Sequence, residues 1–213
     1  MKLLGRITVD DIIDVMEEEN TEDILKISGV SEDEELSGNW KDAVKSRLPW
    51  LVINLGTAFL AASIIRNFDA TVAKLSIISA YMTIIAGMGG NAATQALAVT
   101  VRRISLNDLS DKQAYNTVLK EFLVGMINGA ANGLIVFIVA FFYDANPMLG
   151  LVLFLAMTGN LIIAGLTGAS IPLILKRVGI DPAVASSIII TTFTDCIGFL
   201  LPLWLATKLL LHH

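Results

Sequence analysis

Histidine, cysteine and charge are scarce in this sequence, and each scarcity excludes a class of protein. The only histidines are the last two residues, His212 and His213, which excludes a bis-histidine haem site and a histidine-rich zinc site. Cys196 is the single cysteine, so no internal disulfide can form. Charged residues make up 16% of the chain and hydrophobic residues 54%, with a mean hydropathy of +0.69. This composition is typical of a membrane protein and argues against a soluble domain.

Five long stretches hold almost no charge, namely residues 50–65, 75–101, 122–143, 148–175 and 183–207. All but the first exceed the roughly 20 residues that cross about 30 Å of hydrocarbon. We expect the first to extend through Pro49 at one end and through Arg66 to Phe68 at the other. The pattern predicts an all-α polytopic membrane protein with five transmembrane helices, preceded by a short cytosolic segment and a connecting helix. Buried helices of a soluble core are disfavoured, because these runs leave too little polar surface.

An acidic segment precedes the apolar stretches. Residues 1–48 hold 13 acidic and 6 basic side chains, whereas residues 49–213 hold 7 and 9. Such a segment disfavours nucleic acid as a partner and suits cations. Within it we predict a strand end at residues 7–9, a helix capped by Asp10 or Asp11, and a second helix over residues 32–47.

Basic side chains near the ends of the stretches predict the orientation in the membrane. With the N-terminus in the cytosol, nine of them lie on the inner side and three on the outer side, Arg66, Lys74 and Lys208. We therefore expect a multi-pass protein of the inner or plasma membrane with a cytosolic N-terminus. Five spans then place the C-terminus outside.

Asp195 is the one charged residue within the five stretches, and it lies near the middle of the last. A carboxylate at bilayer depth costs at least ~2.5 kcal/mol on insertion scales, so it marks an ion or proton path by default. Helical spacing places Thr191 one turn before it on the same face, with Thr192 and Gly198 beside it. The alternative is a protonated structural acid, which the absence of an intramembrane Lys or Arg mate disfavours.

The second stretch carries a glycine-rich run at its middle, Gly87-Met88-Gly89-Gly90-Asn91. Each glycine costs roughly 1 kcal/mol relative to alanine in a helix, so we predict a break that bares backbone carbonyls. Asn91, Thr94 and Gln95 would add oxygens to the resulting cavity. The alternative is small residues for tight helix packing. An acid and a glycine break at one depth suggest a cation pathway.

Other polar or small residues have simpler interpretations. Helix–helix packing explains a small-residue ladder and its companions, Gly125, Gly129, Gly133, Asn128, Asn132, Asn160, Gly165 and Gly168. Lys120 and Glu121 are most simply a local charge pair. Asp181 and Pro182 make the turn into the last span, or else Asp181 supplies a cation ligand at the inner mouth.

Three segments combine these features: Gly-Gly-Asn-Ala-Ala-Thr-Gln at 89–95, Lys-Glu-(x)3-Gly-(x)2-Asn-Gly at 120–129, and Asp-Pro-Ala-Val-Ala-Ser-(x)4-Thr-Thr-Phe-Thr-Asp-Cys-Ile-Gly at 181–198. In order and spacing they resemble the MgtE family of bacterial magnesium channels and transporters, over essentially the whole chain. The resemblance implies that residues 1–30 are a remnant of the second CBS module. Residues 31–48 would be the connecting plug helix, and residues 49–213 the pore domain. We expect an excised pore domain rather than a naturally shortened relative.

The resemblance also implies a homodimer in the lipid bilayer that passes Mg²⁺ into the cytosol through a pore on its twofold axis. Asp195 matches the ion-binding aspartate, and Gly87 and Gly90 match carbonyl contributors. Thr94 matches a polar position of the pore, and Thr191 a backbone contributor, with Asn91 beside them. Asp181 matches an inner-side acid linked to gating, at which cytosolic Mg²⁺ would also act as a regulator. No enzymatic activity is implied.

Three rival functions differ in what they require. A proton- or sodium-coupled carrier uses the same intramembrane acid, but its flux should depend on a pH or sodium gradient. An intramembrane hydrolase needs a second acid, or a Ser with a His or Lys partner, at membrane depth, and the chain has none there. A non-transporting scaffold leaves Asp195 unexplained.

Overall fold

The computed structural model describes residues 6–28, 30, 39–106, 110–182 and 186–211, and these residues form helices without any strand. In chain order the helices are α1 (Val9–Ile27), α2 (Trp40–Asn67), α3 (Asp69–Lys74), α4 (Ile78–Leu106), α5 (Asp111–Tyr143), α6 (Pro147–Arg177) and α7 (Ser186–Leu210). Within this described part, five helices are long and apolar enough to cross a membrane: α2, α4, α5, α6 and α7. The predicted all-α fold with five spans is confirmed.

The start of α1 differs from the prediction. Residues 7 and 8 are irregular, and Thr8, rather than Asp10 or Asp11, is the N-cap of the helix. The Asp11 carboxylate accepts hydrogen bonds from the backbone N–H and the hydroxyl of Thr8, both at 2.7 Å. These two bonds lower the pKa of Asp11 below its ordinary value. The predicted strand end is therefore wrong. In a strand the Thr8 backbone N–H would need a partner from another strand, whereas here the Asp11 side chain provides that partner locally.

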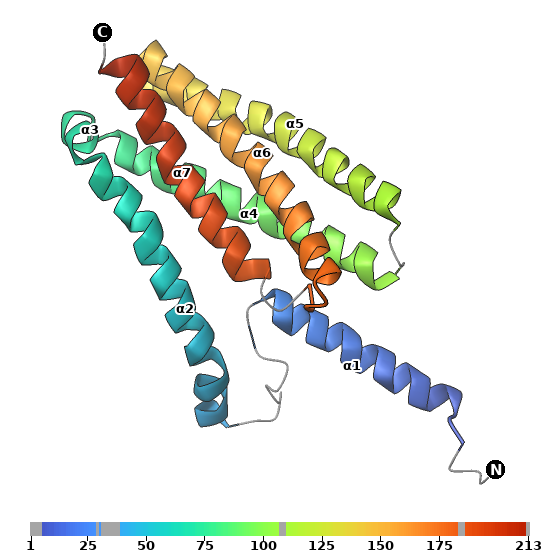
Figure 1. Cartoon of the computed structure of the whole chain (residues 1–213). Coiled ribbons are helices and arrows are strands. Elements are labelled where there is room, and N and C mark those ends of the chain that lie inside the picture. Colours follow the sequence, from blue (N-terminus) through green and yellow to red (C-terminus); the bar gives the residue numbers. More distant parts are fainter. Residues whose placement is uncertain (1–5, 29, 31–38, 107–109, 183–185, 212–213) are drawn as a thin grey trace.

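The connecting segment and the first span form one helix. α2 runs without interruption from Trp40 through Pro49 to Asn67, so the first span extends beyond its apolar stretch as predicted. The predicted start of the connecting helix at residue 32 falls on residues 31–38, which lie outside the described residues. In Figure 1, α2 stands at the edge of the bundle beside α7, and only Ala61 of this helix is buried.

α6 is the central helix of the bundle and packs against α4, α5 and α7 (Figure 1). The glycine ladder of α5 makes the closest of these interfaces. A Cβ atom at Gly125, Gly129 or Gly133 would come closer than 3.0 Å to the α6 backbone at Leu161, Thr158 and Phe154 respectively. The predicted packing role of this ladder is confirmed, since only glycine lets the two backbones approach so closely.

Candidate ion pathway

α4 passes through its glycine-rich run as a continuous α-helix, which overturns the predicted break. Packing provides the reason: a Cβ atom on Gly168 of α6 or Gly198 of α7 would lie closer than 3.0 Å to α4. Two neighbouring helices thus hold α4 against the weak intrinsic propensity of its glycines, and tertiary contacts routinely override that propensity. In lipid, moreover, a broken helix would leave backbone groups without partners.

The glycines of α4 divide between two faces of the helix. Gly89 and Ala93 are buried toward α6. The predicted ion-path residues Gly87, Gly90, Asn91 and Thr94 have the spacing i, i+3, i+4 and i+7, which places them together on the opposite, open face. A Cβ atom at Gly87 or Gly90 would meet nothing within 4 Å. The Thr94 hydroxyl donates to the Gly90 carbonyl oxygen at 2.9 Å, which leaves its oxygen lone pairs available.

Asn160 of α6 fills the notch that Gly89 opens in α4. Its side-chain amide donates to the Ile85 carbonyl oxygen at 2.7 Å, and a Cβ atom on Gly89 would collide with its Nδ2 atom. The side chain is completely buried, and its Oδ1 atom has no hydrogen-bond partner among the residues that the structure describes. Sequence reasoning assigned Asn160 to general packing and missed this contact, because it joins residues 75 positions apart.

Asp195 lies in the middle part of α7 and is partly exposed. Its carboxylate forms no hydrogen bond or ion pair with any residue that the structure describes. The neighbouring threonines instead bond within their own helix: the Thr191 hydroxyl donates to the Ser187 carbonyl at 2.9 Å, and the buried Thr194 hydroxyl donates to the Thr191 carbonyl at 3.1 Å. Asp195 is thus the ionisable side chain of this region whose oxygens have no partner among the described residues.

The glycine-rich run and Asp195 lie at one depth. α4 and α7 run in opposite directions and cross where Gly198 meets Ala86, with a Cβ atom on Gly198 lying 2.7 Å from the Ala86 Cα atom (Figure 1). Asp195 precedes Gly198 by three residues, and Gly89 follows Ala86 by three. At 1.5 Å per residue, each lies about 4.5 Å from the crossing, in the same direction. The predicted coincidence of acid and glycines follows from this crossing.

A single chain supplies little of a metal-binding site. Among the described residues, no three His, Cys, Asp or Glu side chains are grouped closely enough to hold a metal ion. Asp195 is therefore not part of a cluster of such side chains within the described part of the chain.

Asp181 lies apart from this region, just before the start of α7, where α1 meets the bundle. Its carboxylate pairs with Lys26 of α1 at 3.0 Å, and Lys26 also pairs with Glu22 at 3.1 Å. Ile27 packs against a buried cluster at this end, which consists of Ala93, Leu97, Val101, Ala164 and Ile190. The N-terminal helix is therefore attached to the bundle beside the predicted inner-mouth acid.

A second polar region lies between α4 and α5. Gln95, Lys120, Glu121 and Asn128 line a hollow of about 210 Å³, with α6 at its base. The Lys120 Nζ atom lies 3.7 Å from the Glu121 Oε1 atom, as predicted for a local charge pair. The Glu121 side chain is 8% exposed. Gln95 lines this hollow and also follows Asn91 of the open face by one helical turn, so its contribution of an oxygen to the ion path stays a prediction.

The architecture defines the class: a polytopic membrane protein with an acidic residue, Asp195, in the middle part of its last span, on a helix that packs against the glycine-bearing helix α4. Residues 82–205 match the family model MgtE, described as a divalent cation transporter. The chain belongs to the MgtE family.

Curated relatives agree with this assignment. The Magnesium transporter MgtE of Enterococcus faecalis is 41% identical over 199 residues, which cover 93% of this chain and 44% of the relative. The Bacillus subtilis protein of the same name is 34% identical over 205 residues, covering 96% and 46%. That of Thermus thermophilus is 30% identical over 211 residues, covering 98% and 47%. The chain spans less than half the length of each of these three relatives.

Proposed function

We propose that two copies of this chain form a pore on a twofold axis through which Mg²⁺ passes into the cytosol, with the Asp195 pair as the central ion-binding group. The relatives are named magnesium transporters, and the family is one of divalent cation transporters. The main support for the proposal is that Asp195 of α7 and the open face of α4 lie at the same height in the helix bundle. An unpaired carboxylate and an empty glycine-bearing surface at one depth are what an ion path requires.

The charge and hydration of Mg²⁺ suit this arrangement. Two Asp195 carboxylates supply a charge of −2, which balances one divalent ion, whereas a monovalent ion would neutralise only half of it. Mg²⁺ demands octahedral oxygen ligands at about 2.0–2.1 Å and releases its waters reluctantly. A path that keeps most of these waters needs hydrogen-bond acceptors along its wall.

The open face of α4 and the neighbouring turn of α7 supply such acceptors. Inside an α-helix the Gly87 carbonyl oxygen retains a second lone pair. The carbonyl oxygens of Gly90 and Thr191 accept from the Thr94 and Thr194 hydroxyls, which would have to rotate away before a water could bind there. The side-chain oxygens of Asn91 and Thr94 lie along the same stripe of α4. The absence of side chains at Gly87 and Gly90 lets a hydrated ion approach the backbone. These residues would therefore hold the water shell, while Asp195 holds the charge.

The membrane potential suffices as the energy source. A charge that crosses 100 mV gains about 2.3 kcal/mol, so a divalent cation gains about 4.6 kcal/mol on entering a negative interior. No coupling ion is needed. This is consistent with a path that carries one pair of carboxylates and no intramembrane basic residue near them.

Regulation by cytosolic Mg²⁺ would act at the inner end. A cation at Asp181 has to displace Lys26, whose ammonium group now lies 3.0 Å from that carboxylate. Glu22 of α1, which also pairs with Lys26 at 3.1 Å, would share the ion.

The test is uptake of Mg²⁺ into liposomes that hold the purified chain. Asp195→Asn should abolish uptake, while Asp69→Asn, the same change at an exposed position in α3, should leave uptake intact. Unchanged uptake by the Asp195 variant would reject the proposal. Uptake that requires an imposed proton or sodium gradient would instead identify a coupled carrier.

A further inference from the structure

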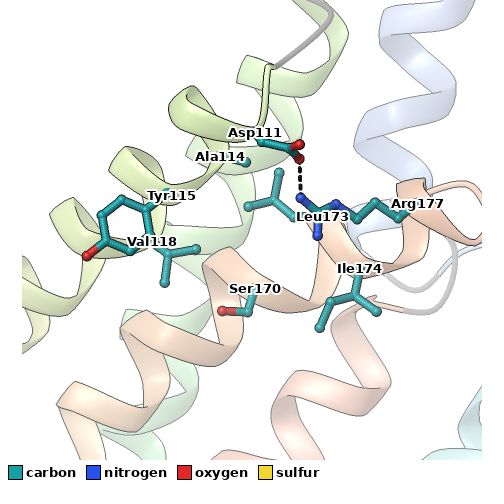
Figure 2. Close-up of a pocket in the computed structure, with 8 residues that line it drawn as sticks. All are labelled: Asp111, Ala114, Tyr115, Val118, Ser170, Leu173, Ile174 and Arg177. Carbon is teal, nitrogen blue, oxygen red and sulfur yellow. Dashed lines mark hydrogen bonds and ion pairs between the residues drawn. The ribbon is translucent and has the colours of Figure 1, made fainter.

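A groove between α5 and α6 lies where α5 begins and α6 ends, and the ion path does not use it. Its volume is about 300 Å³. Figure 2 shows Val118, Leu173 and Ile174 as apolar walls, with Ser170 between the helices. At one end of the groove, Arg177 at the end of α6 forms an ion pair with Asp111 at the start of α5.

The groove follows from where the small residues of the interface stop. Gly165 of α6 packs on the Glu121 backbone, and this is the last close contact that a glycine makes toward the start of α5. No glycine occurs in α5 before Gly125, and Gly168 of α6 turns instead to Ala93 and Ala96 of α4. Larger side chains therefore hold the first turns of α5 apart from the last turns of α6.

The surroundings of the groove determine what fills it. Both helices are membrane spans, and Ile174 and Tyr115 at the groove are 57% and 67% exposed. Apolar side chains exposed on a span face acyl chains, while Tyr and Arg at the end of a span lie at headgroup level. A lipid therefore meets an apolar slot with the exposed Arg177–Asp111 ion pair at its rim.

Arg177 gives the rim a group that can bind a phosphate. It is the cationic side chain among the described residues that line the groove, and Asp111 is the acid that pairs with it. The Arg177 and Asp111 side chains are 69% and 91% exposed, so their ion pair contributes little and can be exchanged. A guanidinium binds a phosphate through paired, charge-assisted hydrogen bonds.

We propose that this groove is a binding site for an anionic phospholipid, with an acyl chain between Val118, Leu173 and Ile174 and the phosphate on Arg177. Asp111 competes with the phosphate for the guanidinium. The two members of the ion pair therefore have opposite effects: Arg177 attracts the lipid and Asp111 weakens its binding. This site depends on the membrane fold alone and is independent of which ion the protein transports.

The experiment is native mass spectrometry of the whole chain titrated with phosphatidylglycerol or phosphatidylcholine. Arg177→Gln should weaken binding of phosphatidylglycerol about tenfold, the loss expected for one charge-assisted contact, and weaken binding of phosphatidylcholine less, because the choline cation offsets the charge of its phosphate. Asp111→Asn should strengthen binding of phosphatidylglycerol severalfold. Lys208→Gln, the same loss of one positive charge in the last turn of α7, is the control and should match the wild type.

Two further outcomes decide the matter. Val118→Trp fills the groove without changing its charge and should weaken binding of both lipids, which separates the slot from general surface attraction. Equal losses in Arg177→Gln and Lys208→Gln would overturn the site, as would equal affinity of the wild type for the two lipids. A shift in the dimer fraction of Arg177→Gln without any change in lipid binding would show that a second copy of the chain, and not a lipid, covers the groove.

Discussion

The contact between Gly89 and Asn160 allows a quantitative test of how α4 is held. Gly89→Ala places a methyl group where the Asn160 amide now lies, since the new Cβ atom would collide with Nδ2. Overpacking a buried contact costs about 1–3 kcal/mol. The displaced amide also loses its 2.7 Å hydrogen bond to Ile85, at about 1 kcal/mol. For a domain of this size, 1 kcal/mol corresponds to about 2–4 °C in Tm, so we expect a fall of several degrees.

The double variant Gly89→Ala with Asn160→Ala separates shape from hydrogen bonding. Removal of the amide vacates the space that the new methyl group needs, so the collision disappears while the hydrogen bond stays lost. We expect the double variant to be more stable than the sum of the single variants by about 1 kcal/mol or more, as for residues in direct contact. Its Tm should lie near that of Asn160→Ala alone.

Thermal unfolding of the purified chain in detergent measures these effects, with Gly56→Ala as the control. A Cβ atom at Gly56 of α2 would meet nothing within 4 Å, so this variant should retain or slightly raise the Tm. Strictly additive losses, or a Gly89→Ala protein as stable as the control, would refute the proposed contact. Mg²⁺ uptake should fall in Gly89→Ala and recover in part in the double variant, because Gly87 and Gly90 flank the displaced turn.

Three further predictions concern other parts of the chain. Gly125→Val should lower the Tm by more than Gly56→Val, because its side chain would enter the Leu161 backbone; equal Tm values would contradict the packing of α5 on α6. Lys26→Gln should make Mg²⁺ uptake more sensitive to inhibition by Mg²⁺ on the inner side, since Asp181 loses the ammonium group that competes with the cation. Flux assays at stepped internal Mg²⁺ concentrations would detect this change, and unaltered sensitivity would show that the Lys26–Asp181 pair has no role in gating. The Asp11 pKa is lowered in the folded state, so its stabilisation of the α1 N-terminus is complete above the ordinary value of 3.8 and lost as the pH falls through the lowered one. The Thr8 amide resonance should report this transition, and Asp11→Asn should remove it.

The reliability of the sequence predictions follows the range of the interactions involved. The five spans were predictable because hydropathy over about 20 residues suffices to specify insertion. The glycine ladder of α5 was predictable because its period of four residues identifies one helix face. The strand end at residues 7–9 was predicted wrongly, because a three-residue apolar pattern carries less information than the capping bonds between Thr8 and Asp11.

The glycine-rich run shows the limit of reasoning from local propensity. Three glycines predict a weakened helix, and they would weaken an isolated one. In the folded chain, Asn160, Gly168 and Gly198 approach α4 from two helices and stabilise it as a continuous helix. The same packing separates Gly89 from Gly87 and Gly90, a distinction that adjacent residues of identical type cannot reveal by themselves.

Composition and hydropathy alone determined that this chain lies in a membrane, how often it crosses, and that Asp195 is its exceptional residue, because solvation by lipid acts on each segment separately. Tertiary packing decided which face of α4 stays open, that Asp195 lies level with the glycines, and where α5 and α6 part to leave a groove. Those features depend on contacts between helices far apart in the sequence, and the free energy of such contacts depends on shapes that meet only in the folded bundle.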